Sequence, residues 1–137
     1  MKSGFSHIQF IVDPANIPHY REIFTTLGWT PIHDDEMHLG LLGANGESFW
    51  FGGGAKEGVA NDYDGIGANH IAIAAESIAD VDAFTEYLAE QGIPALFETP
   101  RHRPEFSSGE GQTYYQVMWA SPDNLLWEFV YMGPLDQ

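Results

Sequence analysis

Two stretches of the chain show the same order of hydrophobic patterns, a short apolar strand followed by an amphipathic helix. The strand patterns cover residues 5–12 and 68–75, where large apolar residues alternate with polar or small ones. Apolar residues at helical spacing come next, and each helical pattern ends at a glycine, Gly28 in the first stretch and Gly92 in the second. The repetition predicts two copies of one structural unit.

In the first copy the helical pattern is followed by three strand patterns. The helix is predicted over residues 15–27, and its apolar face consists of Ile17, Tyr20, Ile23, Phe24 and Leu27. Strands are predicted at residues 29–32, 38–42 and 47–51, and Asn45-Gly46 is typical of the turn in a β-hairpin.

The second copy has the same order. Ser77 precedes the helix and is spaced from Asp80 as a helix cap, and the buried face is predicted to contain Val81, Phe84 and Leu88. Strands are predicted at residues 93–97, 114–120 and 125–131, with a turn at residues 121–124.

This order predicts an α+β protein of two βαβββ modules that form a cupped mixed sheet with the helices on the outside. One helix covers only one face of a four-stranded sheet, so the other module is the natural partner for the second face. We therefore expect a single domain over residues 1–137. Module 1 covers about 4–52, a linker rich in Gly, Asn and Asp covers 53–67, and module 2 covers about 68–132.

Composition narrows the class of protein. The length of 137 residues suits one domain, and the hydrophobic content of 44% excludes a disordered chain. The sequence has no apolar run long enough to cross a bilayer and no signal-peptide pattern, so we expect a cytoplasmic protein. The absence of cysteine excludes disulfides, thiolate metal ligands and a cysteine nucleophile.

The chain is strongly acidic, with 20 acidic and 5 basic residues and a formal net charge of −15. Such a chain repels nucleic acid and anionic membranes, so we expect neither as a partner. Two interpretations stay open: the charge keeps the protein in solution, or it attracts a cationic ligand.

Three side chains on the predicted strands could bind a divalent metal. Strand alternation places His7 and Gln9 on the face opposite the helix, and it does the same for His70. Glu128 lies within an apolar strand, where an unpaired carboxylate would cost on the order of several kcal/mol of desolvation. Two imidazoles and one carboxylate form a ligand set that suits Fe, Mn, Ni or Zn.

Residues 6–8, residues 69–71 and the segment 121–128 resemble the vicinal oxygen chelate superfamily. This superfamily includes lactoylglutathione lyase, bleomycin resistance proteins, fosfomycin resistance transferases and extradiol dioxygenases. The segment 121–128, Ser-Pro-Asp-Asn-Leu-Leu-Trp-Glu, is similar to the Asp-Pro-Asp-Gly-Asn-x-x-Glu turn and last strand of the superfamily, with Ser for the first Asp and without the Gly. The resemblance implies one divalent metal ion held by His7, His70 and Glu128. The fourth ligand of the lyase has no counterpart, because Ser48 or Trp50 occupies its position.

A long segment at residues 99–113 is a candidate lid or binding loop. We expect Arg101 and Arg103 to bind a substrate anion and His102 to act as an acid or base, although both arginines could instead pair with surface carboxylates. Tyr115 is a second candidate catalytic residue. The further candidates for substrate binding are Gln9, Trp50 and Tyr114.

The predicted function is that of a metal-dependent enzyme that chelates adjacent oxygens of a small molecule. Lyase, isomerase, dioxygenase and group-transfer chemistry all stay open. Extradiol dioxygenases have a second catalytic histidine shortly before the position of Trp119, and this chain has none there. A phosphonate site would be surrounded by lysines, but lysines occur only at positions 2 and 56. The alternative is a ligand-sequestering protein without catalysis, similar to bleomycin resistance proteins. In either case we expect a homodimer.

Overall fold

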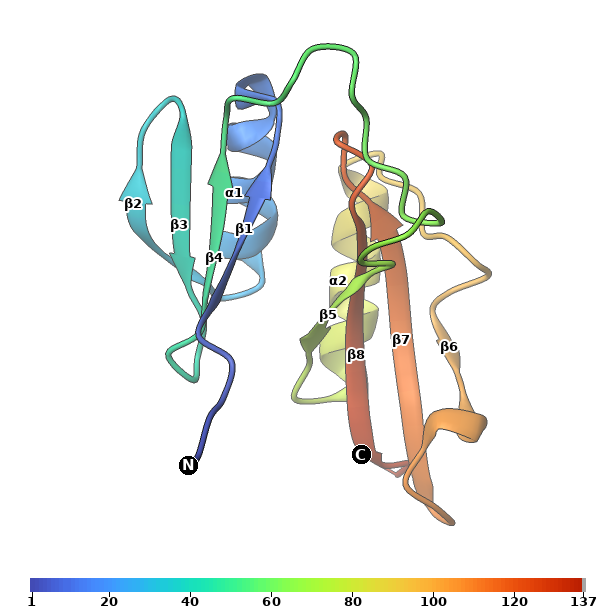
Figure 1. The fold of residues 1–137 in the computed structure, drawn as a ribbon. Coiled ribbons are helices and arrows are strands. Elements are labelled where there is room, and N and C mark those ends of the chain that lie inside the picture. Colours follow the sequence, from blue (N-terminus) through green and yellow to red (C-terminus); the bar gives the residue numbers. More distant parts are fainter. Residues whose placement is uncertain (137) are drawn as a thin grey trace. The chain divides into compact units, whose positions relative to one another are not determined.

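The computed structural model describes residues 1–136, which fall into two compact units, Met1–Ala60 and a second that begins at Asn61 (Figure 1). Each unit contains one mixed four-stranded sheet and one α-helix in the order strand, helix, three strands. The predicted pair of βαβββ modules is thereby confirmed. That the two modules act as one domain stays a prediction.

The first unit has the strand order β1-β4-β3-β2. Strand β1 runs parallel to β4, and the other neighbours are antiparallel. The elements are β1 (His7–Ile11), a 3-10 turn (Pro14–Asn16), α1 (Ile17–Thr26), β2 (Thr30–Asp34), β3 (His38–Leu42) and β4 (Ser48–Gly52).

Helix α1 covers one face of this sheet through aromatic packing (Figure 1). The ring of Tyr20 stacks on Phe51 with centroids 4.3 Å apart, and Phe24 meets the edge of Phe49 at 5.5 Å. At the helix C-terminus Gly28 adopts a φ of 90°, a left-handed conformation that favours glycine. The packing leaves His7 and Gln9 on the opposite face of the sheet, as the alternation of the strand predicts.

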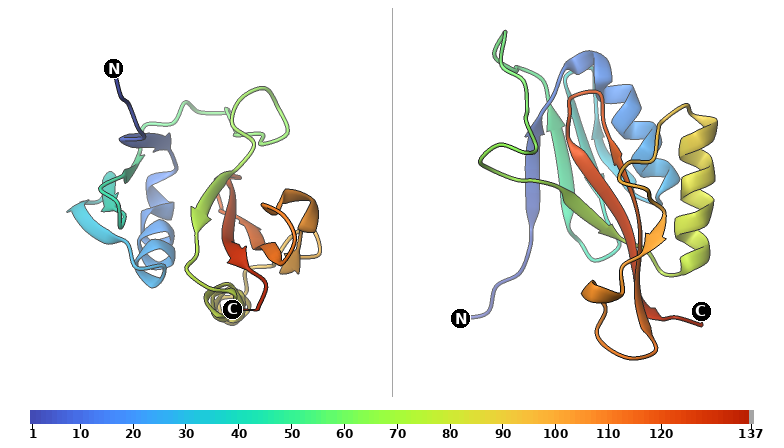
Figure 2. Two further views of the ribbon diagram at one scale, coloured as in Figure 1. Left: turned by 90° about the horizontal axis from the view of Figure 1, so that it is seen from below. Right: turned by 90° about the vertical axis from the view of Figure 1, so that its right-hand side faces the viewer.

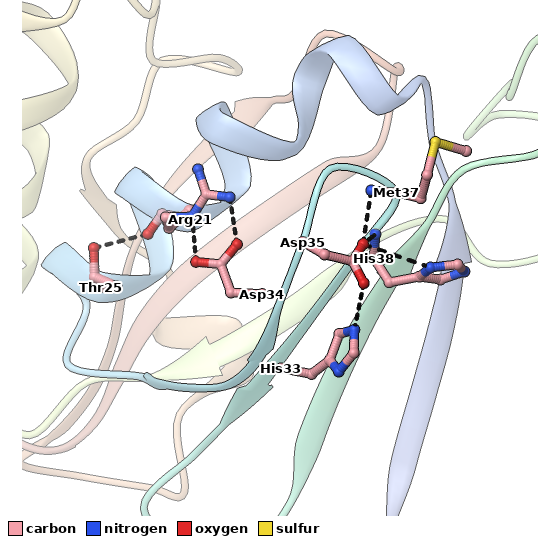
Figure 3. Close-up of polar contacts among 7 residues, drawn as sticks. All are labelled: Arg21, Thr25, His33, Asp34, Asp35, Met37 and His38. Carbon is pink, nitrogen blue, oxygen red and sulfur yellow. Dashed lines mark hydrogen bonds and ion pairs between the residues drawn. The ribbon is translucent and has the colours of Figure 1, made fainter.

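Polar contacts fix the hairpin between β2 and β3 (Figure 3). Arg21 of α1 donates from Nε to Asp34 at 2.7 Å, which ties the helix to the end of β2. The carboxylate of Asp35 accepts the amides of Met37 and His38, both at 2.8 Å, and lies 2.8 Å from Nε2 of His33. The acidic segment between the two strands is therefore a hydrogen-bonded turn.

The second unit has the strand order β5-β8-β7-β6, with β5 parallel to β8 and the other neighbours antiparallel. Its elements are β5 (Ile71–Ala74), α2 (Ile78–Glu90), β6 (Arg101–His102), a 3-10 turn (Pro104–Phe106), β7 (Gln112–Ala120) and β8 (Leu126–Pro134).

Helix α2 covers one face of the second sheet (Figure 2). The hydroxyl of Ser77 accepts the amide of Asp80 at 3.0 Å, which confirms the predicted cap. The ring of Phe84 contacts Trp119 and Phe129 with centroids 4.9 and 5.3 Å apart, and the predicted face of Val81, Phe84 and Leu88 is buried. None of the helices in residues 1–136 is long and apolar enough to cross a membrane.

The strands of the second unit differ in part from those predicted. Residues 93–97 do not form a strand, because Phe97 and Glu98 adopt φ angles of 57° and 60° and the chain turns there. The edge strand is instead the short β6, which lies inside the segment predicted as a loop at residues 99–113. His70 comes directly before β5, one residue outside the strand.

The turn between β2 and β3 makes the stability of the first unit depend on pH. Bonds from the amide of Met37, the ring of His33 and the amide of His38 favour the ionised carboxylate and lower the pKa of Asp35 to about 2. A lowered pKa contributes stability above the ordinary value of about 4, and this contribution is lost as the pH falls towards about 2. We expect Asp35→Asn to lower the urea midpoint at neutral pH, and the difference from wild type to shrink below about pH 4.

Urea unfolding followed by circular dichroism between about pH 3 and about pH 7 tests this expectation. Glu36→Gln is the matched control, because it removes one negative charge from the same turn without removing the bonds to Asp35. A destabilisation by Asp35→Asn that is the same at every pH would contradict the assignment.

Candidate functional site

The second unit contains a pocket of about 660 Å³ on its sheet. The residues around it come from the segment before β5, the turn before β6, the 3-10 turn and strands β7 and β8. The lining residues are Tyr63, Asp64, Asn69, His70, Phe97, Arg103, Phe106, Tyr114, Gln116, Met118, Leu126 and Glu128.

Strand alternation places the floor of this pocket on the sheet face opposite α2. Met118 of β7 pairs with Glu128 of β8, so Tyr114 and Gln116 share that face with Glu128. The residues at the alternate positions of the same strands, including Trp119 and Phe129, pack against the helix. The central strands β7 and β8 therefore separate an apolar core from a face with polar and aromatic groups.

Glu128 is the buried ionisable group of the pocket. The residue is only 2% exposed and lies on the central strand β8, between Ala72 of β5 and Met118 of β7. The hydroxyl of Tyr114 donates a hydrogen bond to Oε1 of Glu128. Burial and this bond raise the pKa of Tyr114 well above its usual value, so the tyrosine keeps its proton at neutral pH and acts as a donor.

His70 is held in one orientation by its neighbour. Asn69 donates from Nδ2 to the carbonyl oxygen of Tyr63 at 2.8 Å, which leaves its Oδ1 as an acceptor. Nδ1 of His70 lies 2.8 Å from this Oδ1, so Nδ1 carries the proton and Nε2 of the neutral ring keeps its lone pair. An oriented imidazole with a free Nε2 suits a metal ligand or a proton acceptor.

The segment that precedes β5 belongs to the pocket wall. Asn61 and Asn124 exchange two hydrogen bonds, each from a side-chain Nδ2 to the carbonyl oxygen of the other residue at 2.8 Å. These bonds fasten residues 61–64 to the turn between β7 and β8. The second half of the predicted linker 53–67 thus forms part of the second unit and supplies Tyr63 and Asp64 to the pocket.

The two arginines of segment 99–113 differ in their positions. Arg103 lines the pocket, with its guanidinium 4.7 Å from the ring centre of Phe106 and its Nε 2.5 Å from Glu105. The bond from Arg103 lowers the pKa of Glu105. Arg101 does not line the pocket and lies 3.9 Å from Glu98. Both arginines thus have carboxylate neighbours, as the alternative interpretation of the sequence expected.

His102 and Tyr115, the two predicted catalytic residues, lie away from the pocket. Tyr115 donates from its hydroxyl to Asp82 of α2 at 2.6 Å, and its ring lies 4.5 Å from that of His102. Nδ1 of His102 lies 2.6 Å from the hydroxyl of Thr113. The physical reason is alternation along β7: because Tyr114 faces the pocket, Tyr115 and its cross-strand neighbour His102 face the helix side.

The remaining predicted residues lie in the first unit, on the sheet face opposite α1. His7 pairs with Ser48 and Gln9 pairs with Trp50, whose Nε1 donates to the hydroxyl of Ser48 at 3.1 Å. The ring of Trp50 lies over Gly40, where a β-carbon would come within 2.6 Å of it. Glu47 accepts the amide of Asn45 in the hairpin turn instead of pointing from β4. Strand β4 therefore presents Ser48 and Trp50 beside His7 and Gln9.

Two of the three predicted metal ligands, His70 and Glu128, line one pocket. Among residues 1–136, no group of three or more His, Asp or Glu residues is arranged to hold a metal ion. The three-ligand site of His7, His70 and Glu128 therefore stays a prediction.

Several pocket residues were missed in the sequence. Gln116 and Met118 are at even spacing from Tyr114 on one strand, a pattern that identifies them once the face of Tyr114 is known. The contact of Asn69 with Tyr63 has no such signal. The turn at Phe97 was also missed, because residues 93–97 have the composition of a strand.

Comparison with solved structures shows the fold. The structure of a "putative glyoxalase" from Bacillus halodurans superimposes with a TM-score of 0.76 at 22% identity, covering 93% of this chain and 94% of that one. The fosfomycin resistance protein FosX of Listeria monocytogenes, in complex with Mn(II) and sulfate, gives a TM-score of 0.67 at 25% identity and covers 99% and 94%. The chain therefore has the fold of the vicinal oxygen chelate superfamily, in its glyoxalase and fosfomycin resistance form, and the resemblance found in the sequence is confirmed.

Sequence comparison adds little on activity. No protein-family model matches the chain. The uncharacterized protein YqjT of Bacillus subtilis (strain 168) is 38% identical over 65 residues, which are 47% of this chain and 47% of that protein. The matched region thus spans about half the length of this curated relative.

The bond between Tyr114 and Glu128 predicts a difference between two adjacent tyrosines. We expect Tyr114→Phe to lower the free energy of unfolding by about 1–3 kcal/mol, because a buried carboxylate loses a donor. Tyr115→Phe is the matched control: it removes a bond to the exposed Asp82, and we expect a loss below about 1 kcal/mol. Urea unfolding at neutral pH measures both values, and equal losses would show that Tyr114 does not support a buried Glu128.

Proposed function

We propose that the pocket of the second unit is the active site of a metal-dependent enzyme that acts on a small oxygenated molecule. The observation that carries this proposal is the pairing of two potential ligands in one pocket. Glu128 is buried and held by Tyr114, and His70 is oriented by Asn69 with Nε2 free. A buried carboxylate and an oriented imidazole in the same pocket are a costly arrangement for a protein that has no use for them.

The chemistry of the predicted donor set suits a divalent metal ion. We propose His7, His70 and Glu128 as its ligands, because two imidazoles with one carboxylate suit Fe, Mn, Ni or Zn. When bound, the ion supplies a Lewis acid that polarises oxygens of the substrate. The Mn(II) present in the Listeria FosX structure supports this choice of ligand chemistry.

The other pocket residues would bind and orient the substrate. Phe97, Phe106, Met118 and Leu126 provide apolar surface for its carbon skeleton. The amide of Gln116 offers a hydrogen-bond donor and an acceptor on the same face as Glu128, and Arg103 supplies a positive charge. Tyr114 keeps its proton and holds the Glu128 carboxylate in place. In this proposal the tyrosine that faces the pocket is Tyr114, whereas Tyr115 faces the helix.

The proposal covers lyase, isomerase, dioxygenase and group-transfer reactions, because a metal ion that chelates adjacent oxygens serves all four on this fold. The second candidate function is sequestration of a cationic ligand without turnover. The aromatic lining of the pocket and the formal net charge of −15 favour it. In both cases we propose a homodimer, as is typical of the superfamily.

Metal analysis of protein purified without a histidine tag tests the proposal. After loading with Fe, Mn, Ni or Zn, we expect about one ion per chain in the wild type. We expect His7→Ala, His70→Ala and Glu128→Gln each to weaken metal binding by at least about a hundredfold, because each removes a direct ligand. His102→Ala is the matched control, because His102 of β6 lies on the helix side of the sheet, so this substitution should leave metal binding unchanged.

Two outcomes would contradict this proposal. Unchanged metal content in all three variants would refute the ligand assignment. Absence of metal binding under every loading condition would favour sequestration, and titration with cationic aromatic ligands would then replace the search for a substrate. Circular dichroism of each variant separates loss of a ligand from loss of the fold.

A further inference from the structure

The pocket is bordered by a tight turn with an unusual backbone. The amide of Thr99 donates to the carbonyl oxygen of Leu96 at 3.1 Å, so Phe97 and Glu98 are the two central residues of a four-residue turn. Their φ angles are 57° and 60°. Two successive left-handed residues characterise the type I′ turn, where Asn-Gly is preferred because a β-carbon crowds the neighbouring carbonyl oxygen. A phenylalanine in this conformation is an outlier.

Thr99 holds the turn in this conformation. The residue is buried, with 8% of its surface exposed, and its hydroxyl donates to the carbonyl oxygen of Leu96 at 2.6 Å. The same hydroxyl accepts the amide of Met118 at 3.0 Å, and the amide of Leu96 donates to the carbonyl oxygen of Met118 at 2.8 Å. The turn is therefore attached at both ends to Met118 of β7, the strand position that pairs with Glu128.

The core does not account for the position of Phe97. Its side chain lines the pocket, yet 49% of the residue is exposed, and the side chain of Glu98 is 92% exposed. Phe106 lines the same pocket and is 56% exposed. Unfavourable backbone conformations persist where the surrounding structure enforces them, and they concentrate at ligand sites. Here the enforced conformation gives the pocket an exposed aromatic wall.

We infer that the turn from Leu96 to Thr99 is a specificity element that places the ring of Phe97 at the pocket wall, against a flat, unsaturated or aromatic part of the ligand. An aromatic ring in this position favours a flat partner because aromatic groups stack or meet edge to face, whereas a saturated ring of the same size does not. The inference rests on the proposed function only in taking this pocket as the ligand site. It requires no metal ion.

The test compares two neutral probes of matched size, 2-naphthol and decahydro-2-naphthol, by calorimetric titration in the presence of EDTA. We expect the wild type to bind 2-naphthol roughly three- to tenfold more tightly than the saturated probe. The double variant Phe97→Asn with Glu98→Gly introduces the preferred turn sequence without the ring. We expect it to lose this preference and to unfold at a higher temperature, because the strain is relieved.

Glu98→Gly alone is the matched control, because it relieves strain in the same turn and keeps the ring of Phe97. It should retain the preference for 2-naphthol while its unfolding midpoint rises. A preference that survives in the double variant would overturn the inference, as would a wild type that binds neither probe or does not distinguish them. A lower midpoint of the double variant would show that the ring serves packing. Because EDTA removes metal, the result is independent of the metal test above.

Discussion

Each sheet of this protein has one helix and two faces, and this imbalance determines where chemistry can occur. Aromatic and aliphatic side chains at every second strand position pack against the helix, as Trp119 and Phe129 pack against α2. The positions between them are released from core packing, and there the second sheet places Tyr114, Gln116 and Glu128. The pocket forms because side chains alternate between the two faces of the sheet and the single helix covers only one of them. This explains why polar residues occur within otherwise apolar strands.

Much of the fold could be predicted because its signals are local. Periodicity located both helices, Ser77 and Gly28 marked ends, and alternation gave the correct face for Glu128 and His70. Which of two adjacent tyrosines enters the pocket depends on the register of β7 against β8, a relation between segments that the sequence pattern did not resolve. The same applies to Asn69 and Tyr63, whose contact forms through a loop without regular structure. The strand predicted at residues 93–97 was wrong because their apolar composition fits a strand, whereas the left-handed backbone at Phe97 has no sequence signal.

The fold identifies the superfamily scaffold, but it does not identify the reaction. Similarity to FosX and to the Bacillus halodurans protein extends over nearly the whole chain, and such scaffolds serve many reactions. What distinguishes this chain lies in its own side chains: a carboxylate bonded by a tyrosine, an imidazole oriented by an asparagine, and an exposed phenylalanine on an enforced turn. These features describe a pocket in which polar groups have fixed positions on the sheet and the apolar wall comes from a turn attached to it.

The reciprocal bonds between Asn61 and Asn124 also bear on how the sequence can vary. They divide the stretch between the sheets into two parts with different tolerance to change in length. Residues 54–60 lie between the end of the first sheet and this anchor, and we expect insertions there to be nearly neutral over evolution. Between Asn61 and His70 the chain is fixed at both ends. A single deletion there would displace Tyr63, and Asn69 would lose the bond that orients it towards the His70 ring. In related sequences, gaps should therefore accumulate before Asn61 and be rare after it.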